Sequence, residues 1–406
     1  MNGRRIYFDF AASSPQAFNG EAVLKDAPFG NPSSAHAEGR LAKNALSQAR
    51  ARCARALGVP EKTLYFTSGG SESNSIVILS QLLHFTTHFR VKEEEGGKQK
   101  KVECLTSAIE HPSVLRPFET LERFGARINY ARPASFGGVL AESALKVFSG
   151  APGCRFVSIQ AVNNETGACS DIKGITAALR RARPEGLFIH SDCVQALGKT
   201  CVNLTGSGID AASFSAHKIG GPRGIGLLYL KKPLEPLVKG GVQEMGLRGG
   251  TENTAGALLF AECMELYATK ENLLREYKAA EIRMERLVLG LRSIKRCVLT
   301  PHFRGDKTYE ARYEGVEGAL FSPYIVSAAF EGIPGPVMAR FLDGAGFAVS
   351  TGAACSQAGA ERKVLLAMGV DEKTASCAVR FSQGYTTTNE EIDLLLNAIE
   401  DACASI

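Results

Sequence analysis

The chain has 406 residues, of which 45% are hydrophobic and 22% charged, and its formal net charge is +5. This balance is typical of a globular protein, and the length exceeds the usual size of a single core, so we expect two domains. No basic block stands out, which argues against nucleic acid as a partner. No run approaches the roughly 18 apolar residues of a membrane helix, so we expect no membrane association.

The eleven cysteines include no CxxC pair. Metal sites need ligands clustered at short spacing, so the sequence predicts no metal site. Free thiols are typical of a reducing compartment, and we therefore expect a cytoplasmic protein.

The first part of the chain alternates helical patterns with short apolar runs. Leu41, Ala45, Cys53 and Leu57 recur at helical spacing before a stop at Gly58. Buried strands that end in polar residues are then predicted by six runs: TLYFTSGG, KVECLTSAIEH, RINYARP, RFVSIQAVNNE, LFIHSDCVQ and AASFSAHK. Strands that alternate with helices predict an α/β fold with a mostly parallel sheet, whose ligand lies beyond the strand ends.

The pattern changes after residue 260. One apolar face predicts a long charged helix that links two domains, with the face formed by Leu273, Leu274, Tyr277, Met284, Leu287 and Leu291. We then expect a loop at 302–322, a strand at YIVSAAFEG, a helix near 335–343, a strand at CAVRFSQG and a last helix from Asn389. These elements predict a smaller α+β domain.

Two strand-end motifs carry groups that fit one ligand. SDCVQALGK ends a strand at Asp192, and SFSAHKIGGPRGIG places Lys218 directly before a glycine-rich turn. Pyridoxal phosphate requires a lysine that forms a Schiff base and a carboxylate that keeps its pyridine nitrogen protonated. FTSGGSESNSI supplies a phosphate site, because Gly69 and Gly70 let the backbone approach closely and Ser71 opens a helix. Each motif alone is more typical of a loop or a cap, but together they predict this cofactor.

With these motifs the chain resembles the cysteine desulfurases of the iron–sulfur-assembly type, which belong with the class V aminotransferases. The resemblance also rests on YFDFAASSP, GNPSSAHAEGR, EHPSV, VNNETG, RGGTEN, STGAACS and VRFSQG. It implies a fold type I enzyme with a mostly parallel seven-stranded sheet flanked by helices, plus a smaller α+β domain. We divide the chain into a large cofactor-binding domain at 14–258 and a small domain at 259–406 that includes residues 1–13.

The resemblance implies a role for each residue around the cofactor ring. Lys218 would hold the cofactor as a Schiff base, and Asp192 would pair with the pyridine nitrogen. His111 would stack on the ring and act in acid–base catalysis. Gln195 and Asn164 would hydrogen-bond near the phenolic oxygen.

The remaining roles concern the phosphate and the substrate. The phosphate would be held by Gly70, Ser71, Ser215 and His217, with Thr251 reaching it from the partner subunit of a homodimer. Arg380, helped by Asn31, would bind the carboxylate of the substrate L-cysteine.

Cys355 is the expected nucleophile, although an arbitrary cysteine is more often buried and structural. Its thiolate would attack the substrate sulfur, which gives alanine and a persulfide that passes to an acceptor such as an iron–sulfur scaffold.

Selenocysteine lyase is the nearest alternative, while plain transamination would leave Cys355 without a task. A third alternative is a cofactor-binding module whose active site has lost its catalytic residues. The presence of the residues named above argues against it. Met245 and Tyr385 depart from residues usual in the family and leave the acceptor open.

Overall fold

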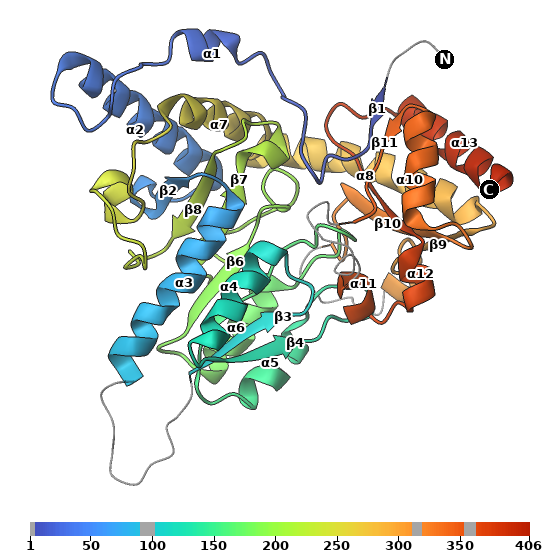
Figure 1. Ribbon diagram of the computed structural model, residues 1–406, viewed down its shortest axis with the longest axis horizontal. Coiled ribbons are helices and arrows are strands. Elements are labelled where there is room, and N and C mark those ends of the chain that lie inside the picture. The colour runs from blue at the N-terminus through green and yellow to red at the C-terminus, as the bar shows by residue number, and fades with distance from the viewer. Residues whose placement is uncertain (1–4, 90–101, 311–318, 353–362) are drawn as a thin grey trace.

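The computed structural model describes residues 5–89, 102–310, 319–352 and 363–406 (Figure 1). The elements form two groups that lie side by side, a larger one built on a seven-stranded sheet and a smaller one built on the C-terminal strands (Figure 1). None of the helices in the described part of the chain is long and apolar enough to cross a bilayer.

The large sheet has the strand order β2-β8-β7-β6-β5-β3-β4. Its strands are β2 (Leu64–Thr67), β3 (Glu103–Ser107), β4 (Arg127–Ala131), β5 (Cys154–Ser158), β6 (Phe188–Asp192), β7 (Ala211–Ser215) and β8 (Gly226–Leu230). The strands from β7 to β4 pair in parallel, and β8 is antiparallel to both of its neighbours. The predicted α/β fold with a mostly parallel sheet is confirmed.

All six predicted strand runs contain a strand of this sheet. One detail of the expectation was wrong, because β4 is only partly buried: it is an edge strand in which Arg127 and Tyr130 are exposed and Ala131 is buried. The seventh strand, β8, was not among the six runs.

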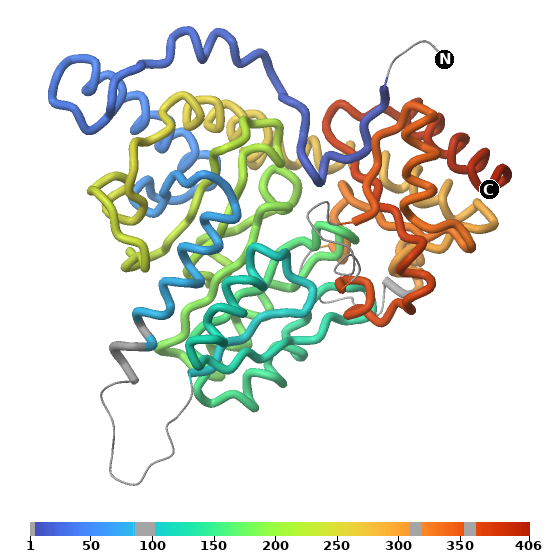
Figure 2. Tube along the Cα trace, in the orientation of Figure 1, coloured from blue at the N-terminus to red at the C-terminus, as the bar shows by residue number. Residues whose placement is uncertain are grey.

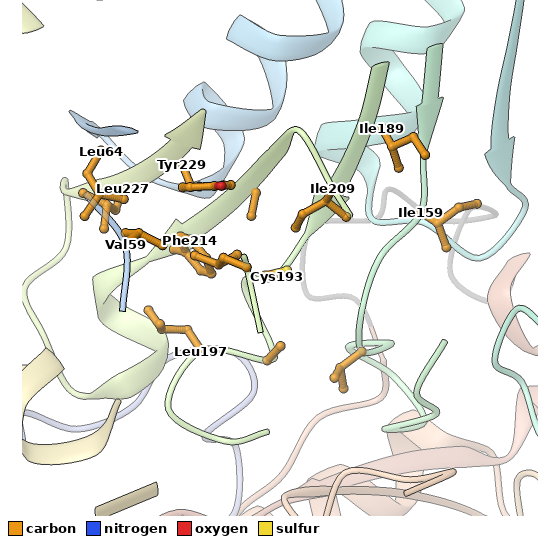
Figure 3. Close-up of a cluster of buried hydrophobic side chains, with 14 of the residues drawn as sticks. Val59, Leu64, Ile159, Ile189, Cys193, Leu197, Ile209, Phe214, Leu227 and Tyr229 are labelled. Carbon is orange, nitrogen blue, oxygen red and sulfur yellow. The ribbon is translucent and has the colours of Figure 1, made fainter. Parts of the chain in front are cut away.

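Helices cover both faces of the large sheet. One face packs against α2 (Ala37–Leu57), α5 (Ala141–Ser149), α6 (Ile172–Ala182) and α7 (Thr254–Tyr267). The other face packs against α3 (Gly70–Phe89) and α4 (Pro112–Arg123). Side chains alternate between the two cores, as they must in a strand: Leu64 and Phe66 lie in the first core and Tyr65 in the second. Figure 3 shows part of the first core, including Phe214 of β7 and Leu227 of β8.

The buried face of α2 differs from the expected one. Leu41 is 60% exposed, while the core side of the helix is formed by Ala42, Leu46, Ala49 and Cys53. The predicted end of this helix is confirmed, since Gly58 caps it with a left-handed φ of 65°.

The smaller group has its own sheet and core. Its antiparallel strands are β9 (Cys297–Leu299), β10 (Ile325–Phe330) and β12 (Ala378–Ser382), in the order β12-β10-β9. They pack against α8 (Lys270–Ser293), α10 (Gly335–Gly344) and α13 (Asn389–Ser405). Leu274 was expected on the buried apolar face of α8, but its side chain is on the exposed side of the helix and is 57% exposed.

The N-terminal segment belongs to this smaller core in space. Strand β1 (Ile6–Tyr7) pairs in parallel with β11 (Phe347–Ala348), and Phe8 is fully buried among C-terminal side chains. Figure 2 shows the blue N-terminal trace running beside the orange and red C-terminal part. The remaining short helices are α1 (Glu21–Lys25), α9 (Lys307–Glu310), α11 (Lys363–Ala367), α12 (Glu372–Ser376) and three 3-10 turns, η1 (Glu61–Thr63), η2 (Ala216–Ile219) and η3 (Gln243–Gly246).

Candidate active site

A cavity of about 270 Å³ lies where the carboxyl ends of the central strands meet the N-terminal segment and β12. Among the predicted site residues, those that line it are Gly70, Ser71, His111, Asn164, Asp192, Gln195, Ser215, His217, Lys218 and Arg380. The position agrees with the rule that ligands of open α/β sheets bind beyond the carboxyl ends of the strands.

Lys218 enters the cavity from η2, the short turn that follows β7. Its Nζ donates hydrogen bonds to the carbonyl oxygens of Ala11 (2.8 Å) and Ala12 (2.9 Å). The chain then turns through Gly220 with a left-handed φ of 79°. A Cβ at Gly220 would clash with the hydroxyl of Tyr385, so both the backbone conformation and the close packing require glycine here.

Asp192 is the last residue of β6 and is buried. Its Oδ1 accepts the backbone N–H of Val194 (2.9 Å), and its Oδ2 accepts the side-chain amide of Asn74 (2.8 Å). These two hydrogen bonds hold the carboxylate in one orientation at the cavity wall.

His111 caps α4 and lies at the cavity wall as well. Its Nδ1 accepts the backbone N–H of Ser113 (3.1 Å) and lies 2.8 Å from the Ser113 hydroxyl. Burial lowers the pKa of the imidazole, and the charge of Lys218 lowers it further, against the opposing effect of Asp192. The ring is therefore neutral at pH 7.

Arg380 reaches the cavity from the middle of β12. Its Nη2 donates to Oδ1 of Asp9 (2.7 Å) and its Nη1 to the carbonyl oxygen of Asn164 (2.9 Å). The side chain is 3% exposed, and its buried Nε has no hydrogen-bond partner among the described residues. These two hydrogen bonds fix the guanidinium at the cavity wall, where its positive charge favours an anion.

Lys199 lies behind Gln195, which lines the cavity. Gln195 donates to the carbonyl oxygen of Ala11 (2.9 Å) and accepts from Lys199 Nζ (3.1 Å). Lys199 is buried, and burial together with the charges of Lys218 and Arg380 lowers its pKa to about 7.

Two predicted residues are not brought into this cavity, and a third cannot be placed. Asn31 and Thr251 are exposed and do not line it, and the Asn31 side chain accepts the backbone N–H of Ser33. Cys355 lies outside the described residues. Their roles stay predictions.

Comparison with known proteins now places the chain in a family. A sequence model of the aminotransferase class-V family matches residues 6–395. The chain belongs to the aminotransferase class-V family. Within it, the chain is 31% identical over 403 residues to a cysteine desulfurase IscS of Dictyoglomus turgidum, an alignment that covers 98% of this chain and 94% of that relative.

Two solved structures resemble this class-V family member along nearly its whole length. A NifS-like protein superposes with a TM-score of 0.85 at 30% identity and covers 99% of this chain and 100% of its own. A structure titled SspA in complex with cysteine gives a TM-score of 0.75 at 29% identity and covers 94% of this chain and 99% of its own.

Pyridoxal phosphate is the cofactor of class-V aminotransferases, and the cavity fits it. The N-terminus of α3 begins at Gly70, where unpaired backbone N–H groups suit a phosphate. A Cβ at Gly70 would meet Val194 at 2.5 Å, so the backbone can pack here only without a side chain. His217, which also lines the cavity, stays neutral at pH 7. Burial is the main cause that lowers its pKa to about 4, and the charge of Lys218 lowers it as well.

Sequence reasoning missed several residues that line or support the cavity in this class-V family member. Ala11, Ala12 and Ser113 line it, Asn74 holds Asp192, and Asp9 holds Arg380. All five lie within motifs that carry the family resemblance, but nothing in their residue types gave them a task. Only the folded chain reveals which side chain each one contacts.

Proposed function

We propose that this class-V family member is a cysteine desulfurase, which converts L-cysteine into L-alanine and passes the sulfur to an acceptor. The observation that carries the proposal is the cavity that gathers a lysine, an aspartate, a neutral histidine and an arginine around one small volume. Its likeness to relatives named cysteine desulfurase, and to a solved structure titled as a complex with cysteine, supports the choice of substrate.

Each cavity residue has a task that follows from its contacts. Arg380 would bind the substrate carboxylate, because it is a buried cation that lines the cavity. Asp192 would keep a proton on the pyridine nitrogen, and Gln195 and Asn164 would bind near the phenolic oxygen. The phosphate would lie against Gly70, Ser71, Ser215 and His217. When bound, pyridoxal phosphate supplies an electron sink for the carbon next to the substrate nitrogen.

Lys218 and His111 would move protons in this cavity. Lys218 is the proposed attachment point of the cofactor, and its amine would take the proton from the substrate once released. His111, neutral at pH 7, would give a proton to the reacting atoms.

Cys355 is the proposed nucleophile, on the evidence of its sequence context alone. The substrate C–S bond breaks, a bond forms between the Cys355 sulfur and the substrate sulfur, and the carbon keeps the electron pair. That carbon takes up a proton to become the methyl group of alanine, and Cys355 carries a persulfide. No external oxidant or reductant is needed for this step.

The direct test supplies purified enzyme with L-cysteine and a reductant and measures alanine and sulfide. We expect both products in equal amounts, none with Lys218→Ala and none with Cys355→Ser. Without reductant, mass spectrometry of the Cys355 peptide should show the addition of one sulfur. Absence of both products from the wild-type enzyme would exclude the proposed activity.

Selenocysteine lyase is the alternative that shares these residues. A C–Se bond is weaker than a C–S bond, so selenium can leave without attack by a thiolate. Rapid turnover of selenocysteine with an unmodified Cys355 would favour the lyase, whereas loss of cysteine activity in Cys355→Ser with retained selenocysteine activity fits the desulfurase.

We further propose a homodimer that works in the cytoplasm and delivers sulfur to an iron–sulfur assembly scaffold. Thr251 would complete the phosphate site of the partner subunit, and exposed apolar side chains precede it at Val238 (79%), Val242 (86%) and Met245 (56%).

The described cysteines are all free, which is usual in a reducing compartment. The division into domains at 14–258 and at 259–406 with 1–13 is part of this proposal. The two separate cores support two units, but α7 crosses residue 258 and packs on the large sheet, so the cores favour a boundary after α7.

A further inference from the structure

The direction of one hydrogen bond fixes the proton of His111. Its Nδ1 accepts the backbone N–H of Ser113 at 3.1 Å. A backbone N–H can only donate, so Nδ1 must offer its lone pair. In the neutral ring the proton is then on Nε2, which makes no hydrogen bond with any described residue.

The same logic extends to the Ser113 hydroxyl. Its oxygen lies 2.8 Å from Nδ1, and because Nδ1 carries no proton, the hydroxyl must be the donor. The side-chain amide of Asn74 lies 2.9 Å from that oxygen and 2.8 Å from Oδ2 of Asp192. A carboxylate only accepts, so the amide nitrogen faces both groups and gives one N–H to each.

The result is a directed chain of hydrogen bonds across three elements. Asn74 on α3 donates to Asp192 at the end of β6 and to Ser113 on α4, and Ser113 donates to His111. Asn74 is fully buried. Buried hydrogen-bond chains of this kind restrict each member to one orientation.

We propose that Ser113 and Asn74 are positioning residues that hold His111 as the neutral tautomer with its proton on Nε2. His111 therefore presents an N–H to the cavity and acts there first as a proton donor, not as a base. The proposal rests on the proposed function only in placing the substrate in this cavity.

The charges around the ring agree with a neutral His111. Burial is the main cause that lowers its pKa, Lys218 also lowers it, and Asp192 opposes them. The other titratable cavity groups are His217 and Arg380, and the neighbouring Glu110 is kept protonated because burial raises its pKa to about 8. Protonation of His111 would also place an Nδ1–H against the Ser113 N–H, and this adds to the cost.

The test reads the tautomer directly. The enzyme as isolated, labelled with ¹⁵N-histidine, gives long-range proton–nitrogen correlations that distinguish the two neutral forms, and the His111 signals are assigned by their loss in His111→Gln. We expect the form with the proton on Nε2 in the wild type. A proton on Nδ1 would overturn the proposal, whether or not the enzyme desulfurates cysteine.

Variants then test the positioning residues. Ser113→Ala removes one donor to Nδ1 and should raise the pKa of His111 by about half to one pH unit, while Ser113→Thr should restore the wild-type value. Thr120→Ala is the matched control on α4, because that hydroxyl donates only to a carbonyl of its own helix. Equal His111 pKa values in Ser113→Ala and Thr120→Ala would contradict the proposed role of Ser113.

Asn74 is tested through Ser113. Asn74→Leu should raise the pKa of His111 in the wild-type background, and should raise it less in the Ser113→Ala background, since Asn74 acts through the hydroxyl. Equal shifts in both backgrounds would show that Asn74 acts on His111 independently, and would overturn its part of the proposal.

Discussion

Lys199 is an amine that the fold buries behind the candidate active site. Its Nζ has the side-chain oxygen of Gln195 as a partner at 3.1 Å, and that oxygen carries no charge. Burial therefore dominates, and its pKa falls from the ordinary 10.5 to about 7. The sequence places this lysine in the motif SDCVQALGK but gives no sign that it is buried.

The lowered pKa of Lys199 predicts that the stability of the protein depends on pH. Between pH 7 and 10.5 the unfolded chain holds the Lys199 proton and the folded chain does not, so the free energy of unfolding should rise with pH in that window. The stability of the wild type relative to Lys199→Met should increase by up to about 1.4 kcal/mol per pH unit. Urea unfolding of both proteins at pH 7, 8 and 9 measures it, and parallel pH profiles would rule out the buried, deprotonated amine.

At the scale of elements, the end of α2 depends on one backbone conformation. Gly58 has a φ of 65°, and a Cβ there would meet nothing within 4 Å. The effect of a side chain at Gly58 on stability would therefore come from backbone strain and not from a steric clash. Gly344 at the end of α10 also has open space for a Cβ, but its φ is not positive.

The two glycines form a matched pair for mutation. Gly58→Ala should lower the free energy of unfolding by about 1 kcal/mol, because an L-residue is strained in the left-handed region. Gly344→Ala should leave it unchanged or slightly higher, since alanine restricts the unfolded chain. Urea unfolding at pH 7 measures both, and equal losses would show that φ is not the cause.

Strand β8 shows why one element escaped prediction. Strand β8 follows β7 after only η2 and a glycine-rich turn, so the two form a closely spaced antiparallel pair within one stretch of the sequence. Its Gly226 lies opposite both Thr67 and Ser215, and a Cβ there would meet Gly69 at 2.6 Å. That requirement depends on the neighbouring strands and cannot be read from a short apolar run.

At the scale of the whole molecule, the cavity is closed by segments from both ends of the chain. Asp9 follows β1 and binds Arg380 of β12, whose side chain is 3% exposed. Asp9→Ala should lower the free energy of unfolding by about 3 kcal/mol, because it leaves a buried guanidinium without its partner. Chemical denaturation measures the loss.

The control for Asp9 is an ion pair of similar chemistry at the surface. Arg286 donates to both oxygens of Asp393 at 2.6 Å, and both side chains are exposed. Asp393→Ala should therefore cost little. A loss as large as that of Asp9→Ala would mean that burial does not explain the effect.

The proposed dimer gives a complementation test. Lys218→Ala and Thr251→Ala each damage a different half of the proposed shared site, so a heterodimer of the two variants contains one intact site. Mixing the inactive variants should restore roughly half of the wild-type activity per heterodimer. Heterodimers that form without any gain of activity would show that Thr251 does not act across the subunit boundary.

The sequence by itself determined the fold class, the positions of most strands along the chain and the main cavity residues. Hydrophobic periodicity and strand-end motifs are local properties, so Asp192 and Lys218 could be assigned to one ligand before any contact was known. The edge position of β4 and the exposure of Leu41 and Leu274 could not be found this way, because apolar spacing does not say which neighbours cover a side chain.

Only the tertiary structure decided what lies around those residues. Asp9 beside Arg380, Lys199 behind Gln195 and Asn74 between two elements are contacts between residues distant in sequence. Their effects on pKa, orientation and tautomer depend on burial and on the direction of hydrogen bonds. Both arise only when the strands, the N-terminal segment and β12 come together, because a polar side chain acquires its function from the partner that the fold gives it.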